Sequence, residues 1–259
     1  MLLILVFFVS VVTIFIWLHP GEKEELKTEA KKTEKVAGTE KEKGIAPKTE
    51  KKKVGSGISV QEKKRLFTVA ITPAVHHVYT DLMEQYHQAE ELLKTDEGNE
   101  QIITLKTKYK VTTNEELLMA LKPHPQSITI AQAAMESSWA TSRFYKEANN
   151  VFGVWSFNKN DQRIAAAENR SGKTIWLKKY NSIEDSIRDY YRTLATGRAY
   201  KEFRALKMQT DDPYKLVKKL DHYSEKGAEY GRELAEIIHF NKLEAYDKTQ
   251  ETTNNLPEK

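Results

Sequence analysis

The chain has 259 residues, of which 39% are hydrophobic and 30% are charged, with a formal net charge of +4 and no cysteine. The lack of cysteine excludes disulfides, thiolate metal sites and cysteine nucleophiles. Lysines and acids are interspersed, so the charge pattern lacks the long basic stripe of a nucleic-acid-binding protein, and no nucleic-acid partner is predicted.

The beginning of the chain has the pattern of a membrane anchor. Residues 1–18 are apolar except for Ser10 and Thr13, and as a helix they would rise about 27 Å, close to the roughly 30 Å hydrocarbon core of a bilayer. No Lys or Arg precedes this run, and no small-residue cleavage site follows it. The pattern therefore favours an uncleaved transmembrane helix over residues 1–19, with a cleaved signal peptide as the alternative.

The composition then changes twice. Residues 20–58 consist mainly of Lys, Glu, Thr, Ala and Gly, and such a segment cannot bury enough apolar surface to offset the entropy of ordering. We expect a disordered linker there. Periodic apolar positions predict one domain over 59–247, with an N-terminal helical part (59–122) and a core (123–247). Residues 248–259 are expected to form a flexible tail.

The N-terminal part of this domain is predicted to be helical. Its apolar positions recur at helical spacing and are expected to form a stripe that is interrupted at Pro73. The members of this stripe are Leu66, Val69, Val75, Val78, Leu82, Tyr86 and Leu92. Further along, Thr112–Glu116 offers a capping box, which predicts the start of another helix.

The core is predicted to begin after Pro123 and Pro125, where Ser127 can cap a helix that runs through Glu136. Later in the core, Ser182 can cap a helix, and another helix is predicted to start at Asp211-Asp212-Pro213, because proline suits the first helical position. The last helix is predicted over about residues 228–243.

One stretch between these helices has strand character. Val151–Phe157 and Thr174–Leu177 are rich in β-branched and aromatic residues, and turn-like sequences lie between them at Asn158–Asp161 and Asn169–Gly172. The predicted fold is therefore α+β and mainly α: a helical body, a small β-hairpin lobe directly after the Glu136 helix, and a cleft between the two lobes.

Glu136 is the candidate for chemistry. It stands near the end of an alanine-rich helix, where the negative end of the helix dipole and desolvation both raise the pKa of a carboxyl group. A carboxyl that stays protonated near neutral pH can donate a proton to a leaving glycosidic oxygen. Composition and position alone favour an ordinary solvated glutamate at a helix end.

The motifs around Glu136 resemble the Bax-like glucosaminidases of glycoside hydrolase family 73. Ile130–Arg143 and then Asn149–Trp155 reproduce an alanine-rich helix, Glu-Ser, Trp, Ser-Arg and Asn-Asn-Val-Phe-Gly in order. The similarity continues through Ser182–Tyr191 and the Tyr-Ser-x-x-Gly…Tyr pattern of Tyr223–Tyr230, so it covers roughly residues 62–246. The resemblance implies a lysozyme-like, two-lobed fold.

The same resemblance implies a peptidoglycan hydrolase that cleaves the β-1,4 bond between N-acetylglucosamine and N-acetylmuramic acid. It would work outside the bacterial cytoplasmic membrane, with glycan strands and the membrane as its partners, and with a membrane or cell-wall protein as a possible further partner. The alternatives are a lytic transglycosylase-like enzyme and a non-catalytic wall-binding or scaffold module. No dinucleotide, P-loop or His-Glu-x-x-His motif occurs, so no cofactor or metal is predicted.

The resemblance also gives roles to individual residues. Glu136 would be the general acid, and Tyr223 would contact the substrate near the reaction centre. Glu168 in the hairpin is the candidate second carboxylate, and the N-acetyl group of the substrate is the alternative nucleophile. The candidates for substrate binding are the polar residues Gln132, Ser138 and Asn150 and the aromatic residues Phe152, Trp155 and Tyr180.

Overall fold

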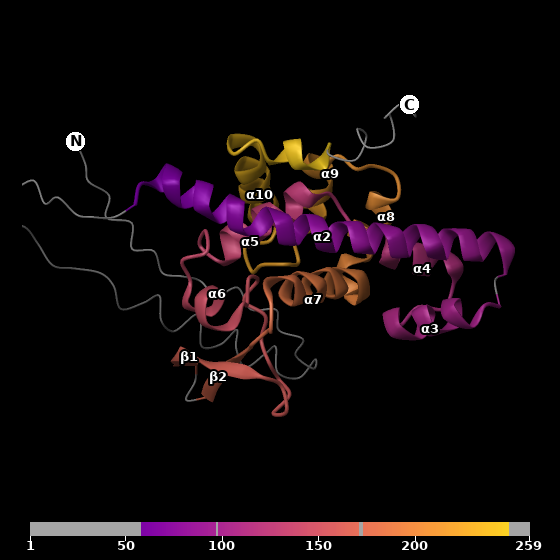
Figure 1. The fold of residues 1–259 in the computed structure, drawn as a ribbon, viewed down its shortest axis with the longest axis horizontal. Helices are drawn as coiled ribbons and strands as arrows, with labels where there is room; N and C mark the ends of the chain where they lie inside the picture. Colours follow the sequence, from indigo (N-terminus) through magenta and orange to yellow (C-terminus); the bar gives the residue numbers. More distant parts are fainter. Residues whose placement is uncertain (1–57, 97, 171–172, 249–259) are drawn as a thin grey trace, which may run out of the picture. The chain divides into compact units, whose positions relative to one another are not determined.

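A computed structural model describes residues 58–96, 98–170 and 173–248 (Figure 1). The predicted anchor lies outside these residues, as do nearly all of the predicted linker and tail. Among the helices that are described, none combines the length and the hydropathy needed to cross a bilayer. The anchor therefore stays a prediction.

The first described helix, α2 (Val60–Thr95), packs against α5 and α7 (Figure 1). The helix continues through Pro73, so the expected interruption is wrong. Proline removes one hydrogen bond, to the carbonyl four residues earlier, and that residue, Val69, is 61% exposed, so water can satisfy the carbonyl. The buried face begins with Phe67 and Ile71, whereas Val69 and Leu66, predicted to be buried, face outward.

The far end of α2 packs with α3 (Glu100–Tyr109) and α4 (Asn114–Leu121). The predicted capping box before α4 is confirmed, with Thr113 accepting from the Glu116 backbone and the Glu116 carboxylate accepting from the Thr113 backbone. A hydrophobic cluster fills the space between these helices. Its members include Tyr86, Ala89, Ile102, Leu105, Tyr109, Leu117 and Leu121. The N-terminal helical part thus shares one packed body with the core.

Helix α5 (Gln126–Glu136) lies at the centre of this body, and its residues from Gln126 to Ala134 are buried. The expected Ser127 side-chain cap is wrong, since Pro125 occupies the cap position and the Ser127 backbone N–H donates instead to Asp247 Oδ1 at 2.8 Å. Asp247 ends a short 3-10 helix, η3 (Leu243–Asp247), so the beginning of α5 is fixed by the end of the domain.

The remaining helices surround α5. The cap predicted at Ser182 and the helix start predicted at Pro213 are confirmed, and the final helix ends at Phe240 rather than near residue 243. These elements are α6 (Arg143–Ala148), α7 (Ile183–Thr196), η1 (Arg198–Tyr200), α8 (Lys201–Lys207), α9 (Pro213–Leu216), η2 (Val217–Lys219) and α10 (Ala228–Phe240). Helix α10 packs against α5, η2 and η3.

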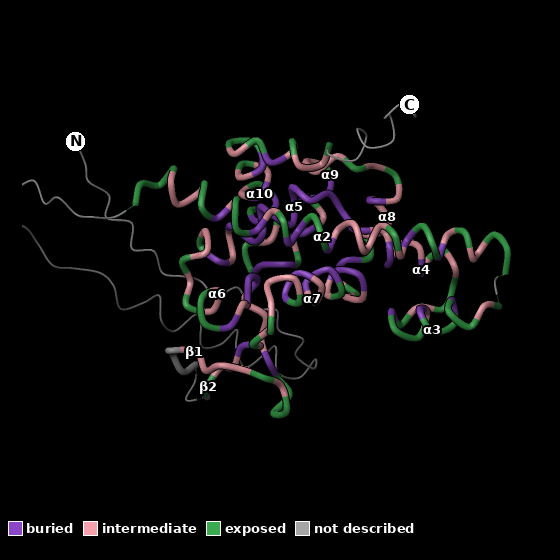
Figure 2. Tube along the Cα trace, in the orientation of Figure 1, coloured by how far each residue is buried: buried purple, intermediate pink, exposed green. Residues whose placement is uncertain are grey.

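The sheet consists of two antiparallel strands, β1 (Arg163–Arg170) and β2 (Lys173–Lys178). The second strand matches the prediction, but the first is wrong. Val151–Phe157 forms only an isolated bridge at Trp155 and Leu177, made by the backbone bonds Ser156 N to Trp176 O and Lys178 N to Val154 O. Buried residues concentrate in the helices, whereas the hairpin is mostly half-buried or exposed (Figure 2). The described chain is therefore mainly helical, with a small hairpin.

Candidate active site

Glu136 is the last residue of α5, and the chain turns sharply after it. Ser138, Trp139 and Ala140 have φ values of 52°, 59° and 62°, the left-handed region that side chains other than glycine disfavour. The Trp139 backbone N–H closes the turn by donating to Ala134 O at 2.8 Å. Ser138, a predicted substrate contact, is exposed within this turn.

Contacts from α2 hold the turn in place. The Trp139 ring meets the edge of Phe67 at a centroid distance of 5.3 Å, and the Lys64 ammonium lies 4.7 Å from the Trp139 ring centre. Aromatic and cation–π contacts of this kind contribute about 0.5–1.5 kcal/mol each, which offsets part of the cost of the left-handed backbone.

The carboxyl group of Glu136 is held by a tyrosine. The Tyr230 hydroxyl, on α10, donates to Glu136 Oε1 at 2.9 Å. Tyr230 stacks on Tyr223 with ring centres 5.3 Å apart and planes at 14°, and Tyr190 and Tyr200 lie on the other sides of Tyr223, each at 6.3 Å. The structure therefore brings Tyr223 close to Glu136, as part of a group of tyrosines.

These tyrosines are neutral hydrogen-bonding groups at ordinary pH. Burial, followed by the nearby charge of Glu136, raises the pKa of both Tyr223 and Tyr230 well above the usual tyrosine value. The same two causes, in the same order, raise the pKa of Tyr200. A neutral phenol can donate to a carboxylate, whereas a phenolate cannot.

Two predicted substrate contacts lie in the interior instead. Gln132 is buried, donates from Nε2 to the Tyr230 hydroxyl at 2.9 Å and accepts from the Tyr190 hydroxyl. Phe152 is also buried, and its ring stacks on Tyr190 with centres 4.1 Å apart. Neither side chain lines a groove in this structure, because each is enclosed by residues of the tyrosine group.

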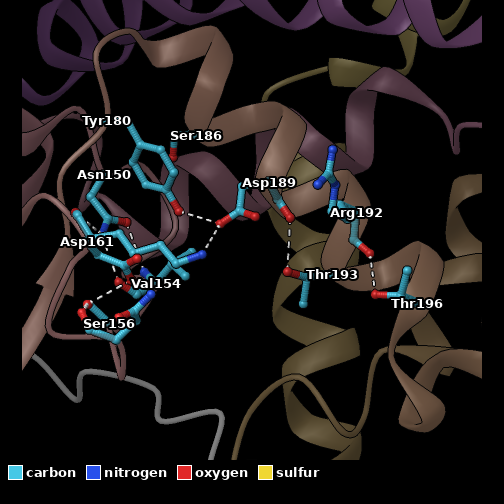
Figure 3. A network of polar contacts seen from close by, with 12 residues as sticks. Asn150, Val154, Ser156, Asp161, Tyr180, Ser186, Asp189, Arg192, Thr193 and Thr196 are labelled. Atoms are coloured by element: carbon cyan, nitrogen blue, oxygen red, sulfur yellow. Dashed lines mark hydrogen bonds and ion pairs between the residues drawn. The ribbon is translucent and has the colours of Figure 1, made fainter. Parts of the chain in front are cut away.

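Asn150 organises the loop that leads to the hairpin. Its buried amide donates to Val154 O at 2.9 Å and Lys178 O at 2.8 Å, and its carbonyl oxygen accepts from Val154 N at 2.9 Å (Figure 3). The donors and the acceptor of the Asn150 side-chain amide are thus paired with backbone groups of the protein. These bonds also explain why the segment after Asn150 is a loop and not the predicted strand.

Tyr180 and Lys178 join the hairpin to α7. The Tyr180 hydroxyl donates to Asp189 Oδ2 at 2.7 Å, and Lys178 Nζ pairs with the same oxygen at 2.8 Å (Figure 3). Burial, followed by the charge of Asp189, raises the pKa of Tyr180. Tyr180 therefore has a structural role at the base of the hairpin, and its half-buried ring leaves the predicted sugar contact untested.

The remaining two predicted site residues lie in or beside the hairpin. Trp155 is half-buried, with its ring centre 6.0 Å from that of Phe157, which is 74% exposed. The buried Trp155 Nε1 has no hydrogen-bond partner among the described residues. Glu168 lies in β1, and its side chain is outside the part of the chain that the structure describes.

Several residues around Glu136 escaped the sequence prediction. Tyr230 belongs to the quoted motif but was given no role, although its spacing from Tyr223 allows both rings to stack. Tyr190 lies in the quoted Ser182–Tyr191 segment and was also given no role, whereas no local pattern marks His124 or Tyr200. In the described part of the chain, no cluster of three or more metal-ligating side chains has the arrangement to hold an ion.

Comparison with known proteins gives one family. The family model for glucosaminidase, described as mannosyl-glycoprotein endo-beta-N-acetylglucosaminidase, matches residues 115–243. Protein bax of Escherichia coli (strain K12) is 29% identical over 116 residues, which are 42% of this chain and 40% of that protein. Exo-glucosaminidase LytG of Bacillus subtilis (strain 168) is 28% identical over 138 residues, 47% of this chain and 46% of that protein.

The matched parts thus cover less than half the length of either relative. Among solved structures, the catalytic domain of the autolysin Auto from Listeria monocytogenes aligns with a TM-score of 0.46 and 20% identity, over 74% of this chain and 92% of that one. This level of structural similarity carries no conclusion about function.

Proposed function

We propose that this chain, which through residues 115–243 belongs to the Bax-like glucosaminidases, hydrolyses the β-1,4 bond between N-acetylglucosamine and N-acetylmuramic acid in peptidoglycan. Glu136 is the general acid in this proposal. The observation that carries it is the position of Glu136 at the end of the buried helix α5, with its carboxyl group held by the Tyr230 hydroxyl.

The proposed chemistry begins with proton transfer. Glu136 donates its proton to the glycosidic oxygen as the bond to the sugar breaks, and the departing sugar leaves as a neutral alcohol. Fixing the acid by hydrogen bonds and packing lowers the entropy that must be lost in reaching the reactive geometry. Water completes hydrolysis at the other sugar.

The group that assists the second half of the reaction has two candidates. Glu168 could act as a carboxylate base or nucleophile, and the acetamido oxygen of the substrate could act as the nucleophile itself. A Glu168→Gln substitution separates them: the carboxylate route loses turnover, whereas the substrate-assisted route keeps it and gives retention of configuration at the anomeric carbon.

Mass spectrometry of purified glycan strands tests the main proposal. The wild-type chain should create new N-acetylglucosamine reducing ends, and Glu136→Gln should lower the rate by about 10²–10⁴-fold. Glu91→Gln, an exposed α2 glutamate paired with Lys94, is the matched control and should digest strands normally. Products ending only in 1,6-anhydro-N-acetylmuramic acid would establish the transglycosylase alternative. Binding of the wild-type protein to glycan strands without turnover would establish the scaffold alternative.

We further propose that the domain acts on the outer side of the cytoplasmic membrane, tethered by residues 1–19. The apolar character of that segment and the location of peptidoglycan support this placement. Protease added to intact spheroplasts should degrade the domain, whereas a protected domain would contradict the proposed location.

A further inference from the structure

A chain of hydrogen bonds runs from the interior of the protein to the carboxyl group of Glu136. Each link joins side chains from different segments of the fold, and every residue in the series except Glu136 is buried. The links in order are His124 Nε2 to Tyr190 OH (3.0 Å), Tyr190 OH to Gln132 Oε1, Gln132 Nε2 to Tyr230 OH (2.9 Å) and Tyr230 OH to Glu136 Oε1 (2.9 Å).

The direction of this chain is fixed at its inner end. The only proton of the Tyr190 hydroxyl goes to Gln132, so its oxygen can only accept from His124. Thr129 Oγ1 lies 3.1 Å from His124 Nε2. The Thr129 hydroxyl donates its proton to the Tyr191 hydroxyl at 2.8 Å. Both oxygens near His124 Nε2 are therefore acceptors, and Nε2 must carry a hydrogen.

The charge state of His124 agrees with this direction. Burial, followed by the charge of Lys207, holds the pKa of His124 well below its usual value, so the ring is neutral at ordinary pH. A neutral imidazole has one N–H, and the contacts assign it to Nε2. The ionisable groups facing His124 are Tyr190 and Tyr191 from α7 and Lys207 from α8.

We propose that His124, Tyr190 and Gln132 are positioning residues that orient every donor of this chain toward Glu136. Tyr230 receives the Gln132 amide hydrogen on its oxygen and is thereby held with its own hydrogen on Glu136 Oε1. A carbonyl oxygen accepts better than a hydroxyl oxygen, so the Tyr230 bond to Oε1 favours Oε2 as the oxygen that carries the transferable proton. The role of Glu136 as the acid rests on the function proposed above. The donor-to-acceptor direction of the hydrogen bonds does not depend on that function.

The chain of hydrogen bonds also affects how readily the Glu136 carboxyl group loses its proton. A hydrogen bond donated to a carboxylate favours its charged form, and bonds in a low-dielectric chain strengthen one another. Breaking an inner link should therefore weaken the Tyr230 bond and favour the protonated form of Glu136. The other ionisable groups near this carboxyl are Tyr190, Tyr200 and Tyr223, all of which keep their protons at ordinary pH.

Two substitutions break the chain without touching Glu136 or Tyr230. Gln132→Met keeps the volume but removes both bonds, and Tyr190→Phe removes one hydroxyl while keeping the ring that stacks on Phe152. Tyr109→Phe is the matched control, because it also removes a tyrosine hydroxyl, bonded to Gln85 at 3.1 Å, that takes no part in this chain of hydrogen bonds. Thermal melting identifies any variant that does not fold, and Tyr190→Phe remains informative if Gln132→Met fails.

NMR on the full-length protein provides a test that does not depend on enzymatic activity. In the wild type, the His124 ring should show hydrogen on Nε2 and none on Nδ1. The titration of the ¹³C-labelled Glu136 carboxyl should move upward by roughly 0.5–1 pH unit in both test variants, the size expected for one weakened hydrogen bond, and stay unchanged in Tyr109→Phe. An unchanged titration in folded test variants, or hydrogen on Nδ1, would overturn the proposal.

Kinetics separate this proposal from the proposed function. Both test variants should lower kcat several-fold with little change in KM, and the alkaline limb of the pH–rate profile should move in the same direction as the NMR titration. If the wild type cleaves no peptidoglycan while the titration still shifts, the proposed function fails and the chain of bonds stands. If the wild type cleaves peptidoglycan and neither titration nor pH profile moves, the positioning role fails alone.

Discussion

The helices around Glu136 and the β-hairpin hold their side chains in different ways. Around Glu136, buried rings from several elements pack on α5, and hydrogen bonds pass between them. The hairpin residues whose burial is described are exposed or half-buried apart from Leu177, and the hairpin is joined to the helices at its base through Asn150 and the contacts of Asp189 (Figures 2 and 3).

The two regions therefore suit two different requirements of an enzyme that acts on a polymer: a fixed general acid and an adaptable binding surface. A general acid works best when its position and protonation are fixed, which dense packing and complete hydrogen bonding provide. A segment with few buried contacts opens locally at low free-energy cost and can adjust to a long polymer. Substitutions in the two regions should therefore differ in kind as well as in size.

The largest expected effect is on stability in the helical region. Leu234→Ala in α10 removes a completely buried side chain and should lower the free energy of unfolding by about 2–5 kcal/mol. Ile175→Ala in β2, where the side chain is only half-buried, should cost less than about 1.5 kcal/mol. Urea denaturation measures both, and equal losses would remove the contrast between the regions.

A smaller effect is expected for the Tyr230 hydroxyl, which contacts the proposed acid Glu136. Tyr230→Phe keeps the ring stacked on Tyr223 but leaves the Gln132 amide without its acceptor, which should cost about 1–3 kcal/mol of stability. In a wall-digestion assay, kcat should fall roughly tenfold, as expected for the loss of about 1.4 kcal/mol in the transition state. A folded variant with wild-type kcat would show that this hydroxyl is dispensable.

A third test uses a charge buried in the helical region. Lys207 donates to the backbone carbonyl of Lys122 at the end of α4, and burial lowers the pKa of Lys207 to about 7. Between this value and the ordinary lysine pKa, the folded state binds fewer protons than the unfolded state, so stability should rise with pH, by at most about 1.4 kcal/mol per unit.

Lys207→Met should remove that dependence. The variant should be more stable than the wild type at pH 6–7, where the wild type keeps a charge in its interior, and should lose this advantage toward pH 10. Urea denaturation at a series of pH values measures the slope. The same slope in both proteins would mean that Lys207 does not titrate in this range.

The smallest effect is expected at the base of the hairpin. Tyr180→Phe removes the hydroxyl bond to Asp189, which keeps its ion pair with Lys178, so the stability loss should be about 0.5–1.5 kcal/mol. Hydrogen exchange should become faster in β1 and β2 and remain unchanged in α5. Faster exchange in α5 would show that the two regions are coupled more tightly than their contacts suggest.

The sequence was most informative where a local rule applies. The caps at Thr113 and Ser182 and the helix start at Pro213 depend on residues close in the sequence, and each prediction is confirmed. Where distant residues decide, local rules failed. Asp247 replaces the expected Ser127 cap, and the side-chain bonds of Asn150 turn an apparent strand into a loop.

For the candidate site as well, local motifs were informative, whereas contacts between distant residues were not predicted. Glu136 and Tyr223 were identified through motifs, and the structure brings them together through Tyr230. Gln132 was placed on a groove because it is polar and near Glu136 in sequence, but a buried glutamine between two tyrosine hydroxyls depends on α7 and α10. Nothing in the local sequence around His124 indicates its partners.

The left-handed turn after Glu136 has a consequence for the order of folding. Consecutive residues in this conformation are disfavoured by roughly 1–2 kcal/mol each, so the turn is not expected to persist in an isolated segment. The contacts that offset this cost come from Lys64 and Phe67 on α2. Glu136 should therefore reach its final place only after the first helix of the domain has docked. A partly folded chain would be inactive, and the capacity to cut would arise only as folding is completed.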